Sequence, residues 1–349
     1  MKRKRWDNSG VAPLKEGGQL VNDSRGKAGQ LLQQFKSVFT KRTTASLPPL
    51  DRPTTVPIDQ LTISTAGVAK LLQELKPHKA PGPDDIPNTV LKICAEPALR
   101  AIYRRSLDRG TLPPDWLQAN ISCAFKKGNR HAPENYRPIS LTSVPCKILE
   151  YIICHHILSH LETHSILTNL NHGFRTGFSC ETQLLTTIHD FLISFDSHKP
   201  IDVAILDFSK AFDTIPHNRL LYKLGNYGIV GPLNQWLSGF LTQRSMTVVL
   251  EGTSSETTSV NSRVPQGTVL GPLLFLCHIN DLPYAVKSQV HLFAMTASST
   301  GKSTPPRITT PCKRTYGSWR HGRTPGACDS TPANATSSAF NTLPLSSIS

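Results

Sequence analysis

The stretch AILDFSKAFDTIPH, residues 204–217, joins an apolar run to two carboxylates. The run IDVAILD, residues 201–207, predicts a buried strand that ends on Asp207, and Asp213 follows six residues later. Phosphoryl transfer is commonly catalysed by two divalent cations, which carboxylates and the phosphates of the substrate hold together. Asp207 at the end of a strand is well placed to bind such a cation. Taken alone, the motif favours a plainer alternative, in which Asp207 caps a helix after a core strand and Asp213 braces the turn.

The size and charge of the chain limit its fold and its partners. Its 349 residues exceed the roughly 250–300 at which a single hydrophobic core stops growing, so about two or three sub-domains are expected. The 38 Lys and Arg residues outnumber the 24 Asp and Glu residues, giving a formal net charge of +14. This excess favours a polyanionic partner, first nucleic acid and second an acidic membrane surface.

The sequence also predicts the compartment. No apolar run reaches the length of about 18 residues that a transmembrane helix needs, so no membrane span is expected. The basic start MKRKRW is not followed by the apolar region of a secretory signal. The 8 cysteines form no C-x-x-C pair, which argues against a zinc site or a disulfide framework. We therefore expect an intracellular protein, with a nuclear location left open by the weak KRKR signal.

Four further motifs accompany the central stretch. They are KAPGPDDIP at 79–87, NYRPISLTS at 135–143, HGFRTGFSC at 172–180 and VPQGTVLGPLLF at 264–275. Together with LDFSKAFDTIPH at 206–217, and in this order, they resemble the reverse transcriptase domain of non-LTR retrotransposons, closest to the jockey-like elements. The resemblance covers roughly residues 60–294. Five ordered motifs make it specific.

The resemblance implies an α+β fold of the right-hand polymerase type, with fingers, a palm and a thumb. Residues 1–60 would be a polar connector, 61–200 a fingers-like region, and 201–294 a palm-like region. The palm would be incomplete and the thumb missing, because residues 295–349 carry no pattern of the family. The implied partners are an RNA template, a DNA primer and deoxynucleoside triphosphates, and the implied cofactor is Mg²⁺. The oligomeric state stays open.

The resemblance also assigns roles to residues of the central stretch. Asp207 would be catalytic and would bind the metal, together with the backbone carbonyl of Phe208. Mg²⁺ suits such a site because it takes one or two protein carboxylates and keeps oxygens of water and phosphate. Phe212 would lie near the sugar of the incoming nucleotide, where an aromatic ring excludes a ribose 2′-hydroxyl.

Other motifs would hold the nucleotide and the template. Lys126 or Lys127, together with Arg137, would bind the triphosphate, since a planar guanidinium matches phosphate oxygens with two hydrogen bonds. Gln266 and Gly267 would line the pocket between template and nucleotide, because glycine lets the backbone approach closely.

Several polar residues have plainer alternatives. Arg130 and Arg175 would contact the backbone of the nucleic acid, although each basic residue taken singly is also explained as a solvated surface charge. In HHILSHLETH, residues 155–164, three histidines recur every four residues. Carboxylate support for a metal site is thin there, so we expect a surface or interface helix.

The next palm motif of the family is a hairpin of the type F-A-D-D. Here Phe293 and Ala294 are followed by Met295 and Thr296, with no carboxylate. A substitution, a different fold and a shift of reading frame are the three explanations. The genetic code favours the last, because ATG for Met followed by ACN for Thr contains GAC, an Asp codon, when it is read one base out of phase.

The following residues fit the same shift. MTASSTG, residues 295–301, is what the codons of D-D-C-L-L-Y-R yield after loss of their first base, and TPGACD at 324–329 is compatible with T-W-G-M-R. Among residues 295–349, 20 are Ser or Thr, 6 are Pro and only Asp329 is acidic. We interpret 295–349 as an off-frame, disordered tail, caused by a one-base deletion or a gene-model junction.

The functional prediction follows from that loss. The chain is predicted to be an RNA-directed DNA polymerase domain that works by two-metal nucleotidyl transfer and that is catalytically defective after Ala294. The alternative is a non-catalytic, basic, nucleic-acid-binding remnant. A third reading is a chain that folds poorly, since the palm sheet would lack its last strand.

Overall fold

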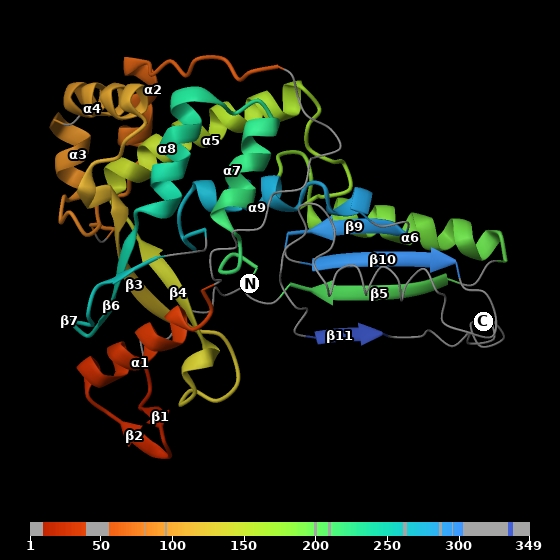
Figure 1. The fold of residues 1–349 in the computed structure, drawn as a ribbon, viewed down its shortest axis with the longest axis horizontal. Coiled ribbons are helices and arrows are strands. Elements are labelled where there is room, and N and C mark those ends of the chain that lie inside the picture. Colours follow the sequence, from red (N-terminus) through yellow and green to blue (C-terminus); the bar gives the residue numbers. More distant parts are fainter. Residues whose placement is uncertain are drawn as a thin grey trace.

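Helices and two β-sheets make up the computed structural model, which describes residues 10–39, 56–79, 81–94, 96–198, 201–208, 211–260, 264–285, 288–294, 296–302 and 334–337 (Figure 1). This mixture of helix and sheet confirms the predicted α+β class. None of the helices in the described ranges is long and apolar enough to cross a membrane.

A layer of helices forms one end of the molecule and surrounds α5 and α9 (Figure 1). Its helices are α2 (Thr65–Gln73), α3 (Asn88–Cys94), α4 (Glu96–Arg109), α5 (Val144–Thr163), α7 (His217–Asn226), α8 (Gly231–Thr242) and α9 (Leu270–Ile279). In α5 the apolar residues recur on one face, and Leu149, Ile153 and Ile157 are fully buried. They share one hydrophobic core with Trp236 of α8 and Phe275 of α9.

The first sheet extends from this helical layer and has the strand order β4-β3-β6-β7, with β8 also paired to β6. Its strands are β3 (Gln118–Phe125), β4 (Tyr136–Leu141), β6 (Ser245–Leu250), β7 (Thr253–Ser254) and β8 (Thr258–Ser259). Short 3₁₀ turns, Pro114–Leu117 and Pro133–Asn135, precede β3 and β4, and a third, Leu282–Ala285, follows α9.

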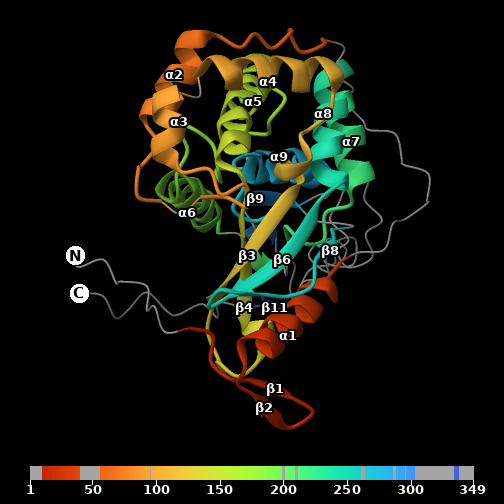
Figure 2. The ribbon, with the colours of Figure 1, turned by 90° about the vertical axis from the view of Figure 1, so that its left-hand side faces the viewer.

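Residues 10–39 pack on the first sheet (Figure 2). They form a hairpin of β1 (Leu14–Glu16) and β2 (Gln19–Val21) and then α1 (Ser24–Lys36). Leu31 and Phe35 of α1 are buried against Met246 and Val248 of β6. The polar connector predicted over 1–60 contains one helical patch in its sequence, AGQLLQQFKSVF at 28–39, and α1 covers most of it. The apolar spacing of α1 gives it one face to bury.

The second sheet lies at the opposite end of the molecule (Figure 1) and is antiparallel throughout, in the order β11-β5-β10-β9. Its strands are β5 (Ile201–Asp207), β9 (Gln289–Phe293), β10 (Thr296–Lys302) and β11 (Asn334–Ser337). Two of these strands fall within 295–349, for which we expect no regular structure. The difference has a physical reason: β10 is paired on both sides through its backbone, and Ala297 is small enough to be fully buried.

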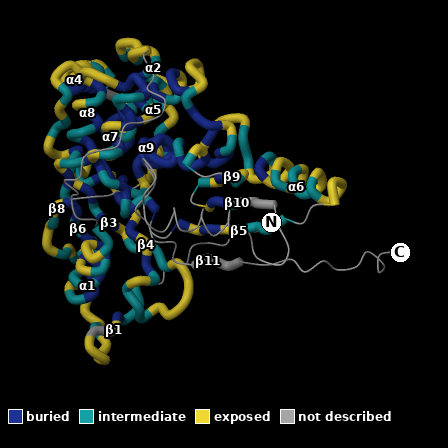
Figure 3. Tube along the Cα trace, turned by 45° about the vertical axis from the view of Figure 1, so that its right-hand side comes forward, coloured by how far each residue is buried: buried dark blue, intermediate teal, exposed yellow. Residues whose placement is uncertain are grey.

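Helix α6 (Cys180–Asp196) runs beside the second sheet, as Figures 1 and 3 show. It begins with a capping box in which Ser179 and Thr182 satisfy each other's backbone N–H groups. The sequence predicts an apolar face on this helix. The structure leaves much of that face exposed, at Leu184, Leu185, Ile188, Leu192, Ile193 and Phe195.

Candidate functional site

Asp207 ends β5 on an exposed face of the second sheet. Its partner on β10 is Thr296, which also pairs with Phe293 across the hairpin, and its partner on β11 is Asn334. Residues directly opposite in an antiparallel pair point to the same face, with Cβ atoms roughly 4.5–5.5 Å apart. The position beside Asp207 on β10 is therefore filled by a hydroxyl side chain instead of a carboxylate. Met295, in the turn, lies outside the described residues.

The loop that contains HGFRTGFSC fixes the β9–β10 turn. The N–H of Leu292 donates to the carbonyl of Leu170 at 2.8 Å, and the N–H of His172 donates to the carbonyl of Leu292 at 3.1 Å. A Cβ on Gly173 would lie 2.3 Å from the backbone nitrogen of Ala294, so only glycine fits. The loop thus follows β9 and passes directly against the turn next to Asp207.

The loop VPQG joins two of the other motifs. The N–H of Val264 donates to the carbonyl of Phe212 at 2.9 Å, and the N–H of Ser140 donates to the carbonyl of Gln266 at 2.8 Å. Gly267 has φ +97°, and a Cβ there would lie 2.9 Å from the Ser140 carbonyl oxygen. Three motifs that are far apart in the sequence therefore meet at this loop.

The central stretch contributes two side chains to the same region. The amide Nε2 of Gln266 lies 3.4 Å from Oδ2 of the buried Asp213, which fits the bracing role considered for this carboxylate. Phe212 is half-buried between Phe174, at 6.4 Å between ring centroids, and Phe275, at 4.9 Å. Phe208 is buried in the core.

The predicted phosphate-binding residues gather on the hairpin between β3 and β4. Lys126, Lys127, Arg130 and Arg137 are all exposed there. Arg137 pairs with Ala124 of the neighbouring strand, while the guanidinium of Arg130 stacks over the ring of Phe125 at 4.9 Å. The structure thus brings these four basic side chains onto one hairpin, and β4 also carries Ser140, the contact of the VPQG loop.

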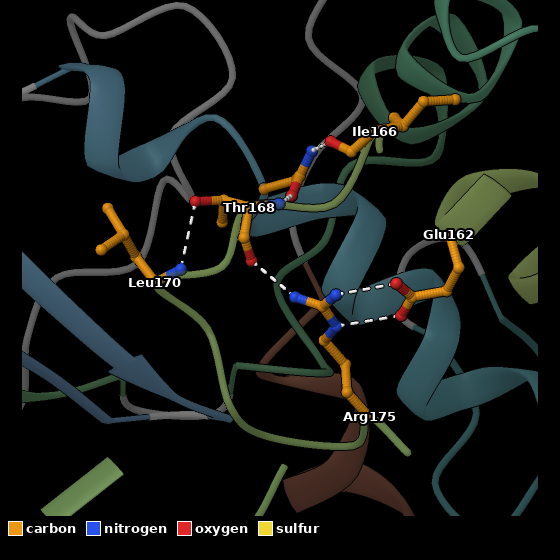
Figure 4. A network of polar contacts seen from close by, with 6 residues as sticks. Glu162, Ile166, Thr168, Leu170 and Arg175 are labelled. Atoms are coloured by element: carbon orange, nitrogen blue, oxygen red, sulfur yellow. Dashed lines mark hydrogen bonds and ion pairs between the residues drawn. The ribbon is translucent and has the colours of Figure 1, made fainter. Parts of the chain in front are cut away.

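Arg175 requires a correction. It is buried, and Nε and Nη2 donate to the two carboxylate oxygens of Glu162 at 3.1 and 2.8 Å (Figure 4). Its Nη1 donates to the carbonyl of Thr168 at 2.7 Å, and its guanidinium lies 4.4 Å from the ring centroid of Phe178. With its donors committed in this way, Arg175 holds the loop in place, which is an argument against the predicted contact with nucleic acid.

Two residues of this region were missed by the sequence reasoning. Glu150, fully buried in α5, accepts hydrogen bonds from the N–H groups of Val269 (2.7 Å) and Leu270 (3.1 Å) at the start of α9. Burial raises the pKa of this carboxyl, and the two N–H groups and Arg244 oppose the rise. The sequence could have indicated this role, because Glu150 is a single acidic residue among the apolar positions of a predicted helix, and a buried charge needs partners.

Asn280 is the second missed residue. Its Oδ1 accepts from the N–H of Thr168 at 2.8 Å, and its Nδ2 donates to the carbonyl of Ile166 at 2.8 Å (Figure 4). Asn280 therefore connects the end of α9 to the segment that precedes the HGFRTGFSC loop. No local pattern signals this role, because both partners lie more than a hundred residues earlier in the chain.

The donor set does not fit a pair of metal ions. Asp207 supplies one carboxylate, Thr296 stands beside it, and Asp213 is directed to Gln266. Over the described ranges, no group of three or more His, Cys, Asp or Glu side chains could hold a metal ion. In HHILSHLETH, His156 and His160 bond to the backbone carbonyls of Asp59 and Tyr227, both at 2.8 Å, as in an interface helix.

Comparisons with known proteins identify the family of this chain and several of its relatives. Residues 125–299 match the reverse transcriptase (RNA-dependent DNA polymerase) family. The chain is 29% identical over 232 residues to the RNA-directed DNA polymerase from mobile element jockey of Drosophila melanogaster, covering 65% of this chain and 25% of that protein. The jockey polymerase of Drosophila funebris is 30% identical over 233 residues, with the same two shares.

A third relative is the "Probable RNA-directed DNA polymerase from transposon BS" of Drosophila melanogaster, 28% identical over 278 residues, which are 76% of this chain and 31% of that protein. The chain thus spans about a quarter to a third of the length of these relatives. The match and the five ordered motifs show that the chain belongs to the reverse transcriptase family, among the polymerases of non-LTR retrotransposons such as jockey.

Proposed function

We propose that this chain is the polymerase domain of a retrotransposon, derived from an enzyme that copies RNA into DNA by two-metal nucleotidyl transfer, and that it is catalytically defective as written. The observation that carries the proposal is the pairing of Asp207 with Thr296. A ligand that binds both ions is needed at the hairpin, and a threonine hydroxyl is a poor substitute for a carboxylate. The loss of such a ligand lowers the rate by several powers of ten.

The site residues receive the following roles under this proposal. Asp207 is the remaining metal-binding carboxylate, and the backbone carbonyl of Phe208 lies next to it in the chain. Phe212 faces the sugar of the nucleotide, and its contacts with Phe174 and Phe275 support a fixed ring. Strands β5 and β9 of the second sheet belong to the palm-like region 201–294, and residues 61–200 correspond to the fingers.

The partners follow from the family. Lys126, Lys127 and Arg137 bind the triphosphate of a deoxynucleotide, Arg130 contacts the template, and Gln266 with Gly267 lines the pocket. The exposure of all four basic side chains on one hairpin supports these roles. Mg²⁺ is the ion that the family's chemistry needs, and the donor set of this chain holds too few carboxylates for it.

Family membership favours descent from a polymerase over the alternative of a protein that arose only to bind nucleic acid. The two hypotheses predict different results for a chain in which the reading frame after Ala294 is restored. In the restored chain, with D-D-C-L-L-Y-R in place of residues 295–301, polymerase activity returns only under the first reading. Under the second reading, both chains bind RNA and neither extends a primer.

Primer extension on an RNA template with Mg²⁺ tests the proposal. The chain as written is expected to give no extension, and the frame-restored chain is expected to extend. Robust extension by the chain as written would overturn the proposed defect. A thermal melt followed by circular dichroism on both chains separates a lost ligand from a lost fold, because a defective but folded chain melts cooperatively.

A further inference from the structure

The outer face of α4 carries four arginines around a shallow hollow. Arg100 and Arg104 lie on one side and Arg105 and Arg109 on the other, with the small residues Pro97 and Ala101 between them. The hollow has a volume of about 510 Å³. The opposite face of the helix, with Leu99, Tyr103 and Leu107, is buried in the core, so the orientation of the arginine face is fixed.

The side chains of these arginines form no ion pair within the described part of the molecule. None of the four side chains makes a hydrogen bond to a described residue, and Nε of Arg100 is buried without a partner. Asp108 lines the same hollow but forms no ion pair with them. A buried donor of a charged group that lacks an acceptor is costly, which indicates that an acceptor arrives from outside the chain.

The spacing of the charges leads to the same conclusion. Arg100 with Arg104, and Arg105 with Arg109, are like-charged pairs four residues apart, an arrangement that destabilises a helix, and Asp108, four residues after Arg104, offsets only part of this repulsion. Anionic groups held between the two pairs would remove this repulsion. Arg100 and Arg109 are nine residues apart, about 13 Å along the helix axis, so a strand laid in the hollow would bring more than one phosphate to the arginines.

We propose that this arginine face of α4 is a second nucleic-acid surface, which binds the phosphate backbone of a single-stranded RNA outside the polymerase site. Arginine suits this partner because its planar guanidinium binds two phosphate oxygens at once. A membrane surface fits less well, because a helix that lies on lipid inserts an apolar face, whereas Leu99, Tyr103 and Leu107 of α4 are buried in the core and Ile102 is the one large apolar side chain of this helix that is exposed.

The place of α4 in the fold favours template RNA over newly made DNA. Figure 1 shows α4 in the helical layer, apart from the sheet that contains β5 and β10. A strand held at α4 therefore lies outside the sheet that carries Asp207, and in a polymerase that copies RNA the long strand present before synthesis is the template. The inference concerns RNA binding only, so a test of RNA binding can support or contradict it whether or not the chain has polymerase activity.

The test is the binding of a fluorescent oligouridine to the full chain, measured by anisotropy over a series of salt concentrations. Arg104→Gln/Arg105→Gln is expected to weaken binding at least several-fold and to reduce the slope of log K against log salt by about 1.4, since each neutralised phosphate of a single strand contributes roughly 0.7. Arg104→Lys/Arg105→Lys should recover most of the slope. Arg25→Gln/Lys36→Gln, which removes two exposed charges from α1, is the matched control. It should leave the RNA affinity and the salt slope within twofold of the values of the unaltered chain.

Unchanged RNA affinity and slope in the Arg104→Gln/Arg105→Gln variant would overturn the proposal. Loss of binding to phosphatidylserine vesicles or to oligodeoxythymidine, with RNA binding retained, would overturn it as well. Protection from phenylglyoxal, which modifies arginine, gives a second measurement on the unaltered chain. RNA should protect the arginines of the peptide Arg100–Arg109, and equal modification with and without RNA would contradict the proposal even if the variants failed to fold.

Discussion

Thr296 is the direct antiparallel partner of Asp207 at the exposed end of β5. The β9–β10 hairpin therefore has the geometry that would place a carboxylate next to Asp207, and it carries the wrong side chain. The backbone needs no rearrangement to accept an acidic residue there, because the face is open to solvent. The defect that we propose is one of side-chain chemistry at a formed turn.

Met295→Asp/Thr296→Asp is expected to create binding of divalent cations. The substitution at Thr296 places a carboxylate directly opposite Asp207. Mn²⁺ or Mg²⁺ would then stabilise the folded protein by about 2.7 kcal/mol at a hundred times the dissociation constant and so raise its melting temperature. A melt with and without each cation measures the shift. Ser254→Asp, an exposed strand position in the first sheet, is the control and should show none. A folded double variant that ignores both cations would show that the hairpin is not the metal site.

Replacement of Glu150 is expected to destabilise the protein strongly. Glu150→Leu leaves the N–H groups of Val269 and Leu270 and the buried Arg244 without their carboxylate, which should cost about 3–5 kcal/mol in the free energy of unfolding. Glu150→Gln keeps an acceptor and should cost less. Urea denaturation measures both, with the exposed Glu134→Gln as a control expected within about 0.5 kcal/mol of the parent. Equal stability of all three variants would rule out the capping role.

His278 is expected to make the fold sensitive to acid. Both ring nitrogens are buried without partners, and burial, followed by repulsion from Lys223 and Arg219, holds its pKa well below the ordinary value. Below about pH 6.5 the unfolded chain takes up a proton that the native state does not, so stability falls by up to about 1.4 kcal/mol per pH unit. Above that pH both states are neutral and the contribution vanishes. His172, whose pKa is also lowered, chiefly by burial, acts in the same direction.

His278→Leu should therefore raise the free energy of unfolding by about 1–3 kcal/mol at pH 8, since two unsatisfied buried nitrogens are removed. It should also flatten the decline between pH 7 and pH 5. His278→Gln does not titrate but keeps polar atoms in the core, so it should flatten the decline without the gain at pH 8. Urea midpoints across the pH range measure both effects, and an unchanged acid slope in both variants would contradict this account.

Arg175→Met is expected to weaken the fold and to leave RNA binding intact. It removes a two-pronged ion pair with Glu162 and the hydrogen bond to Thr168, at a cost of about 1–3 kcal/mol. Arg130→Gln should show the opposite pattern, with unchanged stability and a salt slope reduced by about 0.7. Urea midpoints and oligouridine anisotropy distinguish the two. If Arg175→Met lost RNA affinity while keeping its stability, the original assignment of this residue to nucleic acid would be restored.

The features that the sequence predicted correctly are local. The bounds of the strand that ends at Asp207 follow from an apolar run, although its predicted burial was wrong, since only Leu206 in it is buried. The loop at Gly267 follows from a backbone that only glycine adopts easily. The order of the motifs identified the family. The backbone contacts by which the VPQG loop meets Phe212 and Ser140 were not predicted.

The features that were missed depend on partners elsewhere in the chain. Arg175 lies in a motif of the family, yet its role is decided by Glu162, which no rule of spacing connects to it. The strand β10 has almost no apolar side chains, and its pairing is supplied by β5 and β9. The composition of β10 is that of a segment without regular structure, and it does not predict a strand, because the backbone hydrogen bonds that hold β10 come from the neighbouring strands.

The open face of α6 governs how the protein behaves in concentrated solution. Leu185 and Phe195 expose 68% and 63% of their surface to water, on the same helix as four further exposed aliphatic residues. Apolar patches of this kind favour reversible clustering, which strengthens on warming and in the presence of sulfate. A concentrated sample of this chain is therefore expected to turn opalescent on gentle warming, and at a lower temperature in sulfate than in chloride.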